Sequence, residues 1–103
     1  MIAMHGLYDH VHGRRALIDR RLVAGEIEAA LADSTADRRR QDVAAVLRRA
    51  LQAGRAEMER RIAVTPGRGL ELAAAQSFLV EQILRLAAEA AVEHLYPRDN
   101  PTA

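Results

Sequence analysis

The strongest constraint on the fold is a single break between two long segments of helical character. The break is the run Thr65-Pro66-Gly67-Arg68-Gly69. Proline lacks a backbone donor and disfavours helix in the residue before it, and glycine suits a turn. On both sides of the break, apolar residues recur at steps of three and four, which is the period of a helix and not of a strand. A short connection between two long helices makes them antiparallel neighbours, so the sequence predicts a helical hairpin.

The segment before the break is predicted to be a helix over about residues 36–63. Its apolar stripe consists of Val43, Val46, Leu47, Ala50, Leu51, Gly54, Met58 and Ile62. Ser34 and Asp37 fit a capping box at its start, with aspartate in place of the usual glutamate. Gly54 lies on the apolar side, where the missing side chain would let a neighbouring helix approach closely.

The segment after the break is predicted to be a helix over about residues 69–96, which Pro97 stops. Its apolar residues form two stripes: Leu72, Leu79, Ile83 and Leu86 on one, and Val80, Leu84, Ala87, Ala91 and Leu95 on the next. A helix this broadly apolar is buried by more than one neighbour. We therefore expect the apolar face of residues 72–95 to pack against a partner as well as against the hairpin.

A shorter first helix is predicted over about residues 20–32, with Asp19 as its N-cap. Its apolar stripe is Val23, Ile27, Ala30 and Leu31. The predicted architecture is therefore all-α, with a short first helix and a long antiparallel helical hairpin. The predicted helical domain covers residues 14–97, after an irregular segment over 1–13 and before a tail over 98–103.

Composition narrows the class of function. The chain has 103 residues, no cysteine and a formal net charge of +1. The lack of cysteine excludes disulfides, thiol catalysis and cysteine-based metal sites. No apolar run approaches the ~18 residues that a membrane span needs, and the start does not fit a signal peptide. We expect a cytoplasmic protein that neither enters a membrane nor has nucleic acid as its main partner, since the charge is nearly balanced.

Three histidines near the start, His5, His10 and His12, invite a metal hypothesis. Their spacing matches no helical pair at i and i+4, and Asp9 is the only carboxylate beside them. Neither a cysteine pair nor a His-Glu-x-x-His pattern supports a zinc site. The sequence therefore favours solvated histidines, and no metal ligand is predicted.

Arginine runs invite a phosphate-binding hypothesis. Arg38–Arg40 would lie in the first turn of a helix, where the macrodipole disfavours positive charge. A solvated helix face is the favoured interpretation, because the chain has too few aromatic residues for base stacking. A weak nucleic-acid binder that uses Arg38–Arg40 with Arg48 and Arg49 remains an open alternative.

No catalytic arrangement is predicted either. Gly67-Arg68-Gly69 is two glycines short of a phosphate loop and follows no strand. Ser77 and His94 lie 17 residues apart on one predicted helix, which separates them by about 25 Å. We therefore predict no catalytic, cofactor-binding or metal-binding residue in this chain.

Several motifs nevertheless resemble one family. They are Ile18-Asp19-Arg20-Arg21, Ala53-Gly54-Arg55-Ala56-Glu57, Gly67-Arg68-Gly69-Leu70-Glu71, Phe78-Leu79-Val80-Glu81-Gln82-Ile83-Leu84-Arg85, Glu93-His94-Leu95-Tyr96-Pro97 and Asn100-Pro101-Thr102-Ala103. Over roughly residues 15–103 the chain resembles the N-terminal helical region of the bifunctional protein-PII uridylyltransferase/uridylyl-removing enzyme, in its alphaproteobacterial form. One departure lies between Leu86 and Ala91, where the family has aromatic residues and this chain has Ala87-Ala88-Glu89-Ala90.

The resemblance implies a role in nitrogen regulation. In that family a helical leader precedes a nucleotidyltransferase domain, which carries a Gly-Gly-x-Gly-Arg-x-Glu loop and an Asp-x-Asp pair for Mg²⁺. A hydrolase domain and two glutamine-sensing domains follow, and the whole enzyme transfers UMP from UTP to the PII protein. None of the catalytic motifs occurs here, so no catalytic residue can be transferred from the family. The chain is expected to be a non-catalytic scaffold fragment that packs on the nucleotidyltransferase domain of the same enzyme. The first alternative is a free-standing module for protein interaction or homodimerisation.

Overall fold

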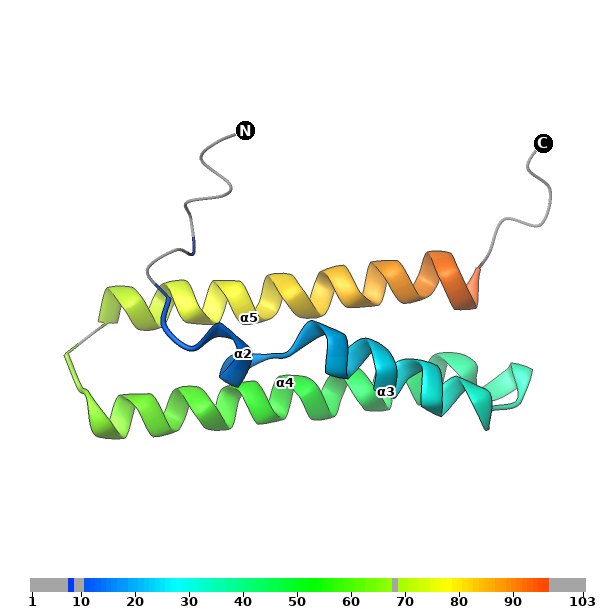
Figure 1. The fold of residues 1–103 in the computed structure, drawn as a ribbon, viewed down its shortest axis with the longest axis horizontal. Helices are drawn as coiled ribbons and strands as arrows, with labels where there is room; N and C mark the ends of the chain where they lie inside the picture. The colour runs from blue at the N-terminus through cyan, green and yellow to red at the C-terminus, as the bar shows by residue number, and fades with distance from the viewer. Residues whose placement is uncertain (1–7, 9–10, 68, 97–103) are drawn as a thin grey trace, which may run out of the picture.

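The computed structural model describes residue 8, residues 11–67 and residues 69–96, and within these it is helical without a strand. Two long helices, α4 (Arg39–Val64) and α5 (Gly69–Ala90), run antiparallel as a hairpin (Figure 1). The turn between them includes Gly67, whose φ of 99° lies in the left-handed region that suits glycine. The predicted all-α fold and helical hairpin are confirmed.

Helix α3 (Arg20–Ala32) has the predicted bounds and the predicted cap. Oδ1 of Asp19 accepts hydrogen bonds from the backbone N–H groups of Arg21 at 3.1 Å and Leu22 at 3.3 Å. These two bonds satisfy donors that the start of a helix otherwise leaves free. Val23 and Ile27 are buried on the side of α3 that faces the hairpin.

The start of α4 differs from the prediction. A 3₁₀ turn, η1 (Ala36–Arg38), precedes the α-helix, and Thr35 is the residue before that turn. The predicted capping box is wrong, because the Ser34 hydroxyl donates to the Thr35 carbonyl and the Thr35 hydroxyl donates to the Asp37 carboxylate. The 3₁₀ turn thus begins one residue later than the Ser34-to-Asp37 spacing indicates, and the α-helix itself begins at Arg39.

The end of the third predicted helix also differs in detail. The α-helix ends at Ala90 and continues as a π-helical turn, η2 (Ala91–Leu95). There the backbone N–H of Tyr96 donates to the carbonyl of Ala91, five residues back, at 2.7 Å. The predicted stop at Pro97 and the predicted tail over 98–103 lie outside the described residues.

One hydrophobic core joins α2, α3, α4 and α5. Its buried apolar residues are Val11, Leu17, Ile18, Val23, Ile27, Val43, Val46, Met58, Ala75, Leu79, Leu86 and Ala90. At its centre Gly54 of α4 meets Leu79 of α5, whose side chain is fully buried. A Cβ atom at Gly54 would lie 2.5 Å from Cδ1 of Leu79 and 2.8 Å from the carbonyl oxygen of Leu17. The close approach predicted from the position of Gly54 is therefore confirmed.

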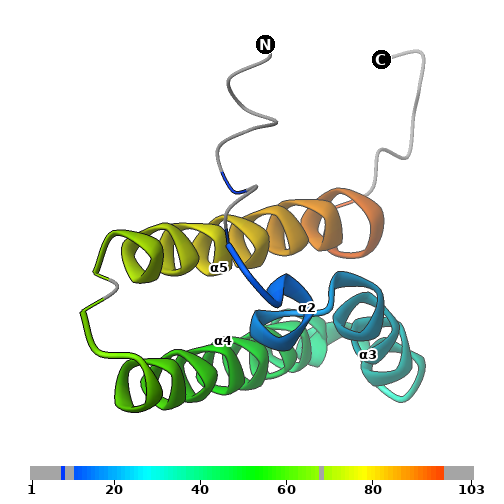
Figure 2. The same cartoon turned by 60° about the vertical axis from the view of Figure 1, so that its left-hand side comes forward.

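The N-terminal part of the chain contributes to this core in a way that the sequence did not predict. A single helical turn, α2 (Arg14–Leu17), lies across the hairpin between α4 and α5 (Figure 2). Val11, Leu17 and Ile18 are each at most 6% exposed. Although the described part of the predicted irregular segment 1–13 is not helical, it packs on the hairpin. Residues 8 and 11–18 are called the strap below.

Candidate functional site

The strap is fastened to α5 by its first described residue. The Tyr8 hydroxyl donates to Oε1 of Glu81 at 2.9 Å, and its ring meets Phe78 edge to face with centroids 5.4 Å apart. Desolvation first, and then the hydrogen bond to the Glu81 carboxylate, raise the pKa of Tyr8 above its ordinary value. Tyr8 is thus a structural contact between distant parts of the chain.

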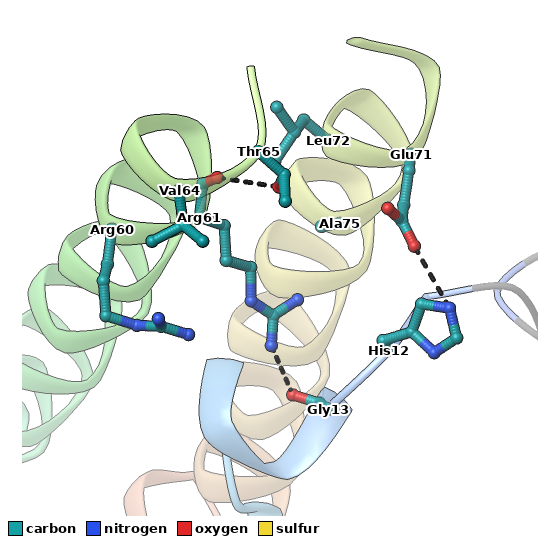
Figure 3. A pocket seen from close by; sticks show the side chains of 9 residues that line it. All are labelled: His12, Gly13, Arg60, Arg61, Val64, Thr65, Glu71, Leu72 and Ala75. Carbon is teal, nitrogen blue, oxygen red and sulfur yellow. Dashed lines mark hydrogen bonds and ion pairs between the residues drawn. The ribbon is translucent and has the colours of Figure 1, made fainter. Parts of the chain in front are cut away.

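A pocket of about 280 Å³ lies beside the turn that joins α4 to α5 (Figure 3). It is lined by His12, Gly13, Arg60, Arg61, Val64, Thr65, Glu71, Leu72 and Ala75. The Arg61 guanidinium donates from Nη2 to the Gly13 carbonyl at 2.8 Å, which fastens the strap to α4. On the opposite wall Nε2 of His12 lies 3.6 Å from Oε2 of Glu71.

The cations of this pocket are already paired. Arg60 and Arg61 both donate to the carboxylate of Glu57, with the shortest N–O distance 2.8 Å for each. The hydrogen bonds from Arg60 first and Arg61 second lower the pKa of Glu57 to about 2. The ion pairs of Arg60 and Arg61 with Glu57 therefore stabilise the end of α4. Among the lining residues of the pocket, no nucleophile lies next to a base.

Exposed large apolar side chains lie along the outer side of α5 and the η2 turn that follows it. Val80, Leu84 and Val92 are 37%, 63% and 66% exposed, whereas Leu79 and Leu86 on the neighbouring stripe are buried. Val80, Leu84 and the exposed Ala88 of α5, together with Val92 of the η2 turn that continues it, are called the outer face of α5 below. The first predicted stripe packs in the core through Leu79, Ile83 and Leu86. The second predicted stripe is exposed at Val80 and Leu84 but half-buried at Ala87, Ala91 and Leu95.

The described histidine of the N-terminal group, His12, gives no support to the metal hypothesis. His12 has an 82% exposed side chain, and His5 and His10 lie outside the described residues. No group of three potential metal-ligating side chains occurs in the part of the chain that the structure describes.

The predicted arginine run is partly engaged in the fold. Arg38 lies 3.8 Å from Oδ1 of Asp42, and Arg39 donates to the carbonyl of His94 at 3.3 Å. Arg48 and Arg49 are exposed. Two members of the run therefore support the fold, and the nucleic-acid alternative remains a prediction.

The burial of the strap is the main feature of the fold that the sequence did not predict. Tyr8, Val11 and Leu17 make it part of the core, yet they follow no helical or strand period. The only sequence signal was that large apolar residues are present in a segment rich in glycine and histidine.

The fold and its surfaces define a helical packing unit: a hairpin that packs against α3 and the strap and has an exposed apolar face.

Three curated bacterial proteins match this chain over most of its length, and each is described as a bifunctional uridylyltransferase/uridylyl-removing enzyme. Identity is 40% over 90 residues for the protein of Novosphingobium aromaticivorans, 39% over 87 for Erythrobacter litoralis and 42% over 89 for Rhodospirillum rubrum. The matches cover 87%, 84% and 85% of this chain, but only 9–10% of each relative.

The resemblance found in the motifs is thereby confirmed: the chain is related to a segment of the bifunctional uridylyltransferase/uridylyl-removing enzymes. It spans about one tenth of the length of the relatives it matches. No protein-family profile and no solved structure matches the chain. In the described part, no helix is long and apolar enough to span a membrane.

Proposed function

We propose that the chain is a helical scaffold segment of a cytoplasmic protein-PII uridylyltransferase/uridylyl-removing enzyme. The whole enzyme would transfer UMP from UTP to PII with Mg²⁺ and would remove it again, while this segment would contribute packing and no catalytic group. The observation that carries the proposal is the outer face of α5. Two of its large apolar side chains, Leu84 and Val92, are more than 60% exposed.

The outer face has the character of a surface that packs on another protein surface. Val80 and Leu84 of α5 and Val92 of the η2 turn follow one another along the chain, while α5 buries Leu79 and Leu86 in the core. Apolar surface of this kind gains about 25 cal/mol for each Å² that a partner removes from water. Contiguous exposed apolar residues on a small domain mark an interaction surface more often than scattered ones do.

The favoured occupant is the remainder of the same enzyme. The relatives are about ten times as long as the matched segment, so a polypeptide of that kind has ample further surface to cover the outer face. The family resemblance indicates the nucleotidyltransferase domain as the part that packs there.

A chimeric enzyme tests this proposal. The matching segment of the Novosphingobium aromaticivorans relative is replaced by this chain, and transfer of UMP to PII is measured together with thermal stability. We expect the chimera to be active, and we expect Leu84→Glu with Val92→Glu to lower its stability and its activity together. The control is Ala44→Glu with Ala56→Glu, which adds the same charge at exposed positions of α4. Equal behaviour of the two double variants would count against the outer face as the docking surface.

The isolated chain separates this proposal from the homodimer alternative. A scaffold segment without its partner should bind an apolar-surface dye and should associate weakly. Light scattering that finds a tight dimer at micromolar concentration, dissolved by the Leu84→Glu and Val92→Glu pair, would favour a free-standing module. A monomer that unfolds cooperatively and binds no dye would contradict both readings of the outer face.

A further inference from the structure

A second surface feature lies where α2 meets α3, with α5 beneath it. It is an open groove of about 580 Å³ lined by Arg14, Arg15, Ile18, Asp19, Arg20, Arg21, Phe78 and Gln82. It shares no lining residue with the pocket in Figure 3. Its volume is in the range of small-molecule sites, about 300–1,000 Å³.

Most of the positive charge in this groove is not neutralised by the fold. Arg20 pairs with Glu89 at 2.6 Å. Arg14, Arg15 and Arg21 are exposed, and none of the ion pairs among the described residues includes them. Three arginines without an ion pair among the described residues therefore line this one groove.

Two arginines of the groove also lie at the start of α3, where the helix dipole disfavours positive charge. Arg20 and Arg21 open α3, and its first turn has no acidic residue. The positive end of the helix dipole disfavours cations there and favours anions. The one acid in the lining, Asp19, directs Oδ1 to backbone amides of the same turn. A bound anion would relieve a repulsion that the folded chain otherwise retains.

An independent observation comes from the floor of the groove. Gln82 is only 7% exposed, yet no hydrogen bond among the described residues involves its side-chain amide. No side-chain polar atom in that part of the chain is both fully buried and unpartnered. The amide must therefore retain access to solvent, and Gln82 lines the groove. Water can hydrate this amide in the free chain, and a ligand oxygen that accepts its N–H would take the place of that water.

We propose that this groove binds a small multivalent oxyanion. Arg14, Arg15 and Arg21 would donate to its oxygens, and the Gln82 amide N–H would donate from the floor. Guanidinium groups bind phosphate and carboxylate in the same forked geometry, so both chemistries fit. Three free cations match a ligand with two or more negative charges better than a monovalent ion. The inference does not depend on the proposed scaffold role.

Calorimetric titration of the full chain at low salt tests the proposal. The probes are inorganic pyrophosphate and citrate, with acetate as a monovalent comparison at equal ionic strength. We expect saturable binding of one molecule per chain for at least one multivalent probe and none for acetate. The tighter probe identifies the source as a phosphate or a polycarboxylate ligand. No saturable binding of either probe would overturn the proposal.

A matched pair of variants separates a site from general attraction. Arg14→Gln with Arg21→Gln should weaken binding roughly tenfold or more, since charge-assisted hydrogen bonds are lost. Arg48→Gln with Arg55→Gln removes the same charge from exposed, unpaired positions of α4 and should leave affinity nearly unchanged. Equal weakening by both pairs would mean attraction to net charge alone and would overturn the proposal.

Gln82→Met gives a readout that a purely structural role would not produce. Methionine nearly preserves the volume and removes the amide, so we expect weaker binding with thermal stability unchanged or raised. Unchanged affinity in this variant would remove the floor contact from the proposal. Tight duplex DNA binding that depends on Arg48 and Arg55, with no binding of the small anions, would identify a nucleic-acid surface in place of the groove.

Discussion

At the scale of single residues, Gly54 and Gly25 are both glycines inside helices, but only Gly54 faces a neighbour. A Cβ at Gly54 would lie within 2.8 Å of Leu79 and of the Leu17 carbonyl, whereas nothing lies within 4 Å of a Cβ at Gly25. Gly54→Ala should destabilise the fold by about 1–3 kcal/mol, because overpacking outweighs the gain in helix propensity. Gly25→Ala should stabilise it by about 0.5–1 kcal/mol. Urea unfolding measures both, and a stabilising Gly54→Ala would contradict the close packing of α4 on α5.

Glu57 makes stability depend on pH. Hydrogen bonds from Arg60 and Arg61 lower its pKa from the ordinary 4.5 to about 2 in the folded chain. A carboxyl group with a lowered pKa stabilises the fold fully above its unfolded pKa, and this contribution is lost as the pH falls through the folded value. The contribution of Glu57 should therefore fade between about pH 4.5 and pH 2.

Glu57→Gln tests this dependence. The variant should be less stable than the parent at pH 6, and the difference should narrow as the pH falls toward 2. Urea midpoints across this range give the comparison, and Asp37, whose pKa is also lowered, is present in both proteins. A stability difference that stays constant with pH would show that the ion pairs contribute nothing.

At the scale of elements, the strap behaves as part of the core, although its regular structure is limited to the single helical turn α2. Val11 in the strap is 4% exposed and Val64 at the end of α4 is 65% exposed. Val11→Ala should cost about 1.5–3 kcal/mol, from two buried carbon groups and the cavity they leave. Val64→Ala should change stability by less than about 0.5 kcal/mol. Similar unfolding midpoints for the two variants would mean that the strap does not stay packed in solution.

The elements that the sequence predicted well are those whose local signals agree with the tertiary fold. Asp19 and the apolar stripe of Val23 and Ile27 specify α3 without reference to any other segment. The strap has no such local signal, because its burial depends on a hairpin formed by residues far along the chain. The same holds for the groove, which Arg21 and Gln82 line together only after α3 packs on α5.

At the scale of the whole molecule, one core cluster reaches from the strap through Leu79 to Ala90 at the end of α5. Because no helix has a core of its own, the chain should unfold in one step.

The two tyrosines allow a test of one-step unfolding, since Tyr8 is in the strap and Tyr96 follows η2. Tyr96→Phe leaves fluorescence from the strap, and Tyr8→Phe leaves fluorescence from the residue that follows η2. We expect each signal to change at the same urea concentration as the far-ultraviolet circular dichroism of the same variant. If the Tyr8 signal changed well before the helical signal, the strap would be a separate, weaker unit, and the hairpin would be the only cooperative part of the fold.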